Sequence, residues 1–109
     1  MLGIKKQQVA KKNNNHLAKV FAKKLRSAER RLLNGTKCSK QTKINAVNDL
    51  DDLIHISLRN KANTKLWKLH KQAIKVLKEV AQMAPGEIAQ DVRSNARNIL
   101  FTVTIEKNL

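Results

Sequence analysis

INAVNDLDDLIHISL, the stretch from Ile44 to Leu58, decides the fold that we expect for this chain. A helix turns by about 100° per residue, which sorts the residues of this stretch onto two faces. The apolar face holds Ile44, Ala46, Val47, Leu50, Leu53, Ile54, Ser57 and Leu58, and the polar face holds Asn48, Asp49, Asp52, His55 and, one residue further, Arg59. A helix with so wide an apolar arc is stable only when neighbouring elements cover it. We therefore interpret this stretch as the spine of a small helical bundle.

Three other segments have apolar residues at helical spacing. The first runs from His16 to Leu33 and the second from Lys65 to Ala84. The last follows Pro85-Gly86, and we expect a helix to about Phe101; beyond it the tail is left open, because ILFTVTI also alternates like a strand. Gly and Pro are scarce, which favours long helices over a turn-rich β fold. The sequence therefore predicts an all-α fold, a compact four- to five-helix bundle.

The breaks between these segments have the chemistry of helix ends. We expect Asn13-Asn14-Asn15 to separate a basic flexible leader, residues 1–12, from a single bundle domain, residues 13–109. Asn34-Gly35 is typical of a left-handed C-cap, and Met83 to Gly86 of a sharp interhelical turn. The predicted N-caps are Ser39 or Thr42 for the spine helix and Thr64 for the segment after it.

The charge of the chain is strongly positive and unevenly distributed. The net charge is +15 over 109 residues, and residues 1–43 hold 13 Lys and Arg against Glu29 alone. Such a field attracts nucleic acid, an anionic membrane surface or acidic protein segments. The sequence has no secretory segment and no long apolar run, so we expect a soluble protein that is neither secreted nor membrane-spanning.

Residues with catalytic or metal-binding chemistry are few and scattered. The single Cys38 rules out an internal disulfide framework, and the three histidines His16, His55 and His70 have no metal-ligand spacing. There is no glycine-rich phosphate loop and no nucleophile motif. We expect His70 to be structural and Trp67 to be a core anchor. The sequence thus predicts a protein that is not an enzyme and has no cofactor and no metal site.

Two stretches resemble a known family. INAVNDLDDLIHIS (Ile44 to Ser57) resembles the second helix of the integrase-binding domain of lens-epithelium-derived growth factor, and AIKVLKEVAQM (Ala73 to Met83) resembles its following long helix. EIAQDVRSNARNIL then stands in the place of its closing helix. The wider group of helical bundles includes the N-terminal domain of transcription elongation factor S-II. The resemblance covers about Leu25 to Phe101.

The resemblance implies a nuclear chromatin or transcription protein that docks short disordered partner segments mixing acidic and aromatic residues. Separately, we expect the protein to be a monomer. The family's pocket lies between the first and the last interhelical loop. The corresponding partner-binding positions are Gly35, Thr36 and Lys37 in the first loop and Met83, Ala84 and Pro85 in the last, with Lys75 and Lys78 placed to meet acidic partner residues. Thr36 and Met83 stand where the family has an acidic and an aromatic residue.

The basic residues leave a second function open, that of a small helical protein that binds DNA non-specifically or binds structured RNA. Two basic faces can contact phosphates or an acidic partner: Lys19, Lys23, Arg26 and Arg30 on the first helix, and Lys61, Lys65, Lys68 and Lys71 on the third segment. A charged row opposite a core face is also what most surface helices present. A purely structural assembly subunit is a third class.

Overall fold

The described part of the chain folds into four α-helices. The computed structural model describes residues 2–33, 38–84 and 86–108, and the side chains of 16–33, 38–84 and 86–104. The helices are α1 (Leu2–Leu33), α2 (Lys40–Arg59), α3 (Thr64–Ala81) and α4 (Gln90–Asn108), and the described residues contain no strand. The predicted all-α helical bundle is confirmed, with four helices.

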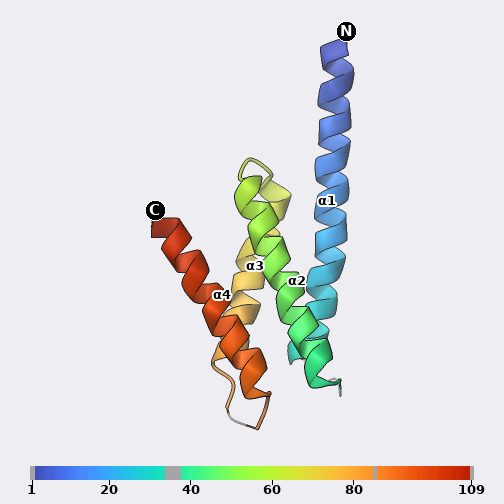
Figure 1. Cartoon of the computed structure of the whole chain (residues 1–109). Coiled ribbons are helices and arrows are strands. Elements are labelled where there is room, and N and C mark those ends of the chain that lie inside the picture. Colours follow the sequence, from blue (N-terminus) through green and yellow to red (C-terminus); the bar gives the residue numbers. More distant parts are fainter. Residues whose placement is uncertain (1, 34–37, 85, 109) are drawn as a thin grey trace.

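Helices α2 and α3 form the centre of the molecule. Both pack against each other and against α1 and α4, whereas α1 and α4 do not touch in the described part of the chain. In Figure 1, α1 lies on one side of the central pair and α4 on the other, and α3 lies behind α2. Helices α1 and α3 run in one direction, and α2 and α4 run in the opposite one. The result is a flat bundle, with principal extents of 59 × 33 × 18 Å.

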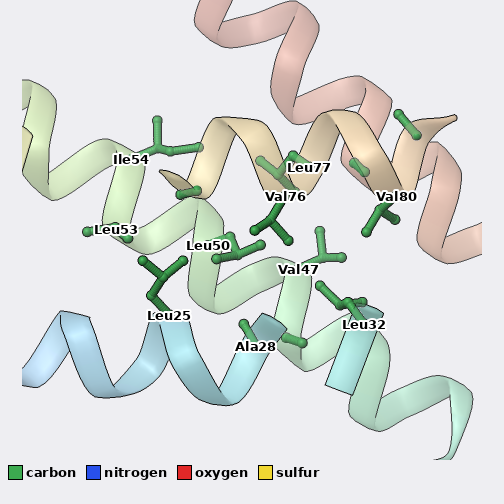
Figure 2. Packing of buried hydrophobic residues seen from close by; sticks show 14 of the residues in the cluster. Leu25, Ala28, Leu32, Val47, Leu50, Leu53, Ile54, Val76, Leu77 and Val80 are labelled. Carbon is green, nitrogen blue, oxygen red and sulfur yellow. The ribbon is translucent and has the colours of Figure 1, made fainter. Parts of the chain in front are cut away.

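The core follows the predicted apolar faces. The buried residues of α2 are Ala46, Val47, Leu50, Leu53, Ile54 and Ser57, all of them on the face that the sequence predicts to be buried. Leu25 and Leu32 of α1 and Val76, Leu77 and Val80 of α3 meet them from the two neighbouring helices (Figure 2). The predicted role of α2 as the spine of the bundle is therefore confirmed.

Helix α1 begins much earlier than predicted. It starts at Leu2 instead of His16, so the predicted break at Asn13-Asn14-Asn15 is wrong. Asparagine is less favourable than alanine in a helix by only about 0.7 kcal/mol, and no proline or glycine lies between Ile4 and Asn34 to interrupt the helix. The helix crosses residue 12, and the division into a leader and a bundle domain stays a prediction.

Helix α4 continues through the stretch whose conformation the sequence left open. It extends to Asn108 instead of ending near Phe101. The hydroxyls of Thr102 and Thr104 donate to the carbonyls of Asn98 and Leu100, four residues earlier, at 3.0 and 2.9 Å. These bonds let the two β-branched polar residues sit in a helix without unsatisfied hydroxyls.

Two details of α3 differ from the prediction. Its N-cap is Asn63 instead of Thr64, and its last residue is Ala81 instead of Ala84. The helix ends early because a proline disfavours the helical conformation of the residue before it, here Ala84. Trp67 is half-buried and stacks on the His70 ring at 4.4 Å between centroids, so it is not the core anchor that the sequence predicts. The predicted cap at Asn34-Gly35 lies outside the described residues.

Ser39 is the N-cap of α2, one of the two residues predicted for that role. Its Oγ accepts a hydrogen bond from the Thr42 amide at 3.1 Å. Replacing Ser39 with alanine removes this acceptor from an amide that has no partner within the helix, and we expect the free energy of unfolding to fall by about 1 kcal/mol. Urea denaturation followed by circular dichroism measures the change. Ser94→Ala, at an exposed position inside α4, is the matched control, with an expected change below about 0.5 kcal/mol. Equal effects of the two substitutions would show that Ser39 does not act as a cap.

Candidate interaction site

The structure describes only part of the predicted docking site. Gly35, Thr36, Lys37 and Pro85 lie outside the described residues. Lys75 and Lys78 are exposed on α3, and Ala84 is exposed after it. Met83, in the last loop, is half-buried and packs against the hydrophobic core. Its side chain therefore helps to stabilise the bundle.

A pocket of about 450 Å³ lies at the end of the bundle where the chain enters α2 and α4. Lys43 lines it from α2, the segment 86–89 lines it from the last loop, and Gln90 and Arg93 line it from α4. Gly86 has φ +97°, a conformation that side-chain-bearing residues rarely adopt, and it turns the chain back toward α4. Ile88 is buried and anchors this loop to the core.

Two arginines of α4 join this helix to the end of α3 and to the last loop. Arg97 donates from Nε and Nη2 to the Ala81 carbonyl, at 3.3 and 3.1 Å, and Arg93 donates from Nη1 to the Met83 carbonyl at 3.0 Å. These bonds satisfy carbonyls at and beyond the C-terminal end of α3, where no further helical amide is available. The Nε atom of Arg93 is buried and has no hydrogen-bond partner among the described residues. Arg93, held by its bond to Met83, thus gives the pocket a positively charged wall.

The electrostatics of this end of the bundle favour an anionic ligand. The N-termini of α2 and α4 both lie here, and each contributes a partial positive charge. The first turn of α2 contains no acid, and the first turn of α4 contains Asp91, which forms an exposed 3.1 Å ion pair with Lys40. An exposed pair of this kind contributes little energy. Lys43 and Arg93 line the pocket, and among its described lining residues Glu87 is the one acid.

The predicted basic residues lie on α1, α3 and the turn between α2 and α3. Lys19, Lys23, Arg26 and Arg30 are exposed along α1, and Lys61, Lys65, Lys68 and Lys71 are exposed on the turn and α3. The structure brings members of the two sets together at one place, where Lys19 and Lys65 line the same groove. Lys19, Lys23 and Arg26 also line a recess of about 290 Å³ on α1.

His55, His70 and Cys38 each make separate local contacts and do not form one cluster. His70 is buried against Ser57, with 2.6 Å between Nδ1 and Oγ, and His55 Nδ1 lies 3.1 Å from Oδ1 of Asp51 on its own helix. Cys38 Sγ donates to the Arg31 carbonyl at 3.5 Å. Within the described part of the chain, no three His, Cys, Asp or Glu side chains are placed to hold a metal ion.

No described helix has an apolar stretch long enough to cross a membrane. Comparisons with protein-family models, with curated proteins and with solved structures give no match for this chain.

Sequence reasoning missed most of the pocket. Lys43 and Arg93 are 50 residues apart and belong to different helices, so no motif links them. The usable signal was the helix-end chemistry at Ser39 and at Pro85-Gly86, which indicates that a helix begins near each of the two residues. The two helix starts are neighbours only because of the direction in which each helix packs, and the sequence does not show this direction.

Proposed function

We propose that this chain is a non-enzymatic docking domain that binds a short, disordered, acidic segment of another protein. The observation that carries the proposal is the end pocket, defined by Lys43, residues 86–90 and Arg93, with two cations and two helix N-termini around it. Its volume of about 450 Å³ is within the range of about 300–1,000 Å³ typical of ligand sites. The pocket is large enough for one aromatic side chain with acidic neighbours.

The partner's chemistry follows from the surroundings of the pocket. Ile88 and Ala89 supply apolar contact for an aromatic anchor, and Lys43 and Arg93 supply partners for carboxylates. The net charge of +15 increases the rate of encounter with an acidic chain more than it increases affinity. A disordered segment loses conformational entropy on binding, so affinity depends on the anchor as well as on the charges.

The resemblance to the integrase-binding domain supports a docking site at this same end of the bundle. The family's pocket lies between the first and last interhelical loops, and the end pocket lies beside the last loop. By that resemblance we propose that the protein acts in chromatin or transcription in the nucleus. By the same resemblance, Lys75 and Lys78, which are exposed on α3, would meet acidic residues of the partner segment.

Selection of peptides from a displayed random library on the immobilised domain tests the proposal. We expect the selected peptides to contain Asp or Glu next to an aromatic residue. The Lys43→Glu variant should bind them at least about tenfold more weakly, because it places a like charge beside the partner's carboxylates. Fluorescence anisotropy with one selected peptide measures the change.

Arg59→Glu is the matched control, because Arg59 is exposed at the opposite end of the same helix and the substitution changes the net charge equally. We expect it to weaken peptide binding by less than about threefold, an effect of net charge alone. Circular dichroism must show both variants folded. Equal weakening by the two variants, or selected peptides without acidic residues, would contradict the end pocket as the docking site.

A further inference from the structure

The parallel helices α1 and α3 enclose a second surface feature, away from the end pocket. It is a shallow groove of about 210 Å³ whose floor is formed by Ala18, Ala22 and Leu69 and whose two rims carry Lys19 and Lys65. Further along the same pair of helices, Gln72 Nε2 donates to Glu29 Oε1 at 2.9 Å and holds α1 against α3. The groove therefore lies on the face of the bundle that α1 and α3 share.

We propose that this face binds the phosphate backbone of a double-stranded nucleic acid, independently of the end pocket and without sequence preference. The residues that carry it form two rows: Lys19, Lys23 and Arg26 on α1, and Lys65, Lys68 and Lys71 on α3. We call these residues the α1–α3 basic face.

Few of the described acidic side chains lie on the two helices that carry the rows. Glu29 lies beside the rows and bonds to Gln72, and Glu79 lies near the C-terminal end of α3. The other acidic side chains that the structure describes belong to α2, the last loop and the start of α4, where Asp49 pairs with Arg31 at 2.9 Å and Asp91 pairs with Lys40. Apart from Glu29 and Glu79, the described acidic side chains thus lie on elements other than α1 and α3, which favours a polyanion on the α1–α3 basic face.

The spacing of the rows suits two phosphate strands. Packed helices lie about 8–10 Å apart, between the widths of the minor and major grooves of DNA, about 6 and 12 Å. Lysine and arginine side chains on the two helices therefore reach the backbones on both sides of one groove. Along α1, Lys19 to Arg26 spans about 10 Å at a rise of about 1.5 Å per residue, enough for several consecutive phosphates.

Two features argue for a duplex over a single strand or an acidic peptide. Single-strand binders stack bases on exposed aromatic rings. On this face Phe21 is buried in the core, and Trp67 is half-buried and already stacks on His70. The volume of the groove, about 210 Å³, is below the range of about 300–1,000 Å³ that is typical of ligand pockets. The groove is therefore too small to hold the anchoring side chain of a peptide.

The test compares wild type with Lys19→Glu/Lys65→Glu by fluorescence anisotropy on a mixed-sequence DNA duplex, at salt concentrations from about 50 to 200 mM. We expect the wild type to bind the duplex with steep salt dependence. The variant should bind at least about tenfold more weakly at the lower salt, and its slope of log affinity against log salt should be shallower by about two, because two phosphate contacts are lost.

The matched control is Lys40→Glu/Arg59→Glu, which makes the same change in net charge at the two ends of α2. Its affinity should fall by less than about threefold, with an unchanged slope. Equal loss in the two double variants would overturn the proposal, because the net charge alone would then explain binding. Unmeasurable binding of wild type at the lower salt would also overturn it.

Three further probes test the occupant. An RNA duplex of the same length shows whether A-form backbone is bound as well, and binding to either duplex supports the proposal. A single-stranded oligonucleotide bound as tightly as the duplexes, or polyglutamate that displaces a bound duplex more efficiently than unlabelled duplex does, would overturn it. Lys43→Glu should leave the slope of log affinity against log salt on duplex DNA unchanged. The proposal for the end pocket and the proposal for the α1–α3 basic face can therefore fail independently of each other.

Discussion

Replacing Leu50 with alanine is expected to lower the free energy of unfolding by about 3 kcal/mol, the largest single effect that we predict. Leu50 has no exposed surface and belongs to α2, one of the two helices that contact all three others. Figure 2 shows it between apolar side chains of α1, such as Leu25, and of α3, such as Val76. Because three helices share this contact, none of them can move inward to close the cavity without losing its own packing.

Urea denaturation followed by circular dichroism measures this loss. Phe101→Ala is the control, because Phe101 is 68% exposed and deleting its ring leaves no cavity. We expect the control to change the free energy of unfolding by less than about 0.5 kcal/mol. A loss below about 1 kcal/mol for Leu50→Ala would contradict the described packing of α1, α2 and α3.

The second large effect is expected at the polar pair in the core, Ser57 and His70. These residues are 0% and 1% exposed, and Ser57 Oγ lies 2.6 Å from His70 Nδ1. Ser57 Oγ also donates to the Ile54 carbonyl at 2.8 Å. A hydroxyl has one hydrogen, so both contacts are satisfied when Nδ1 of His70 carries a hydrogen and donates it to Oγ.

Ser57→Ala removes this acceptor from a buried ring, and we expect the free energy of unfolding to fall by about 2 kcal/mol. His70→Phe keeps a ring against Trp67 but removes both nitrogens. In the double variant neither polar partner remains, so the combined loss should be smaller than the sum of the two single losses by at least about 1 kcal/mol. Urea denaturation of the four proteins of this double-mutant cycle measures the coupling. Additive losses would show that the hydrogen bond does not contribute to stability.

The predicted buried face of α2 was confirmed because burial there depends on local periodicity. Residues three and four apart share a face in any helix, so Leu50, Leu53, Ile54 and Ser57 come together whatever packs against them. The start of α2 at Ser39 was predicted for the same reason, since a cap acts within one turn. The error at Asn13 to Asn15 and the open prediction beyond Phe101 both arose where helix propensity is close to neutral. There the choice between helix and loop depends on less than about 1 kcal/mol per residue.

The sequence by itself determined the helical fold class, the core face of α2 and the excess of positive charge, because each depends on residue type or on neighbours along the chain. The tertiary structure alone decided which distant residues meet. It places Lys43 beside Arg93 in the end pocket, Lys19 across a groove from Lys65, and Ser57 against His70. These contacts depend on the order and direction in which four helices pack, and helix packing is set by the fit of whole surfaces, which no local motif records.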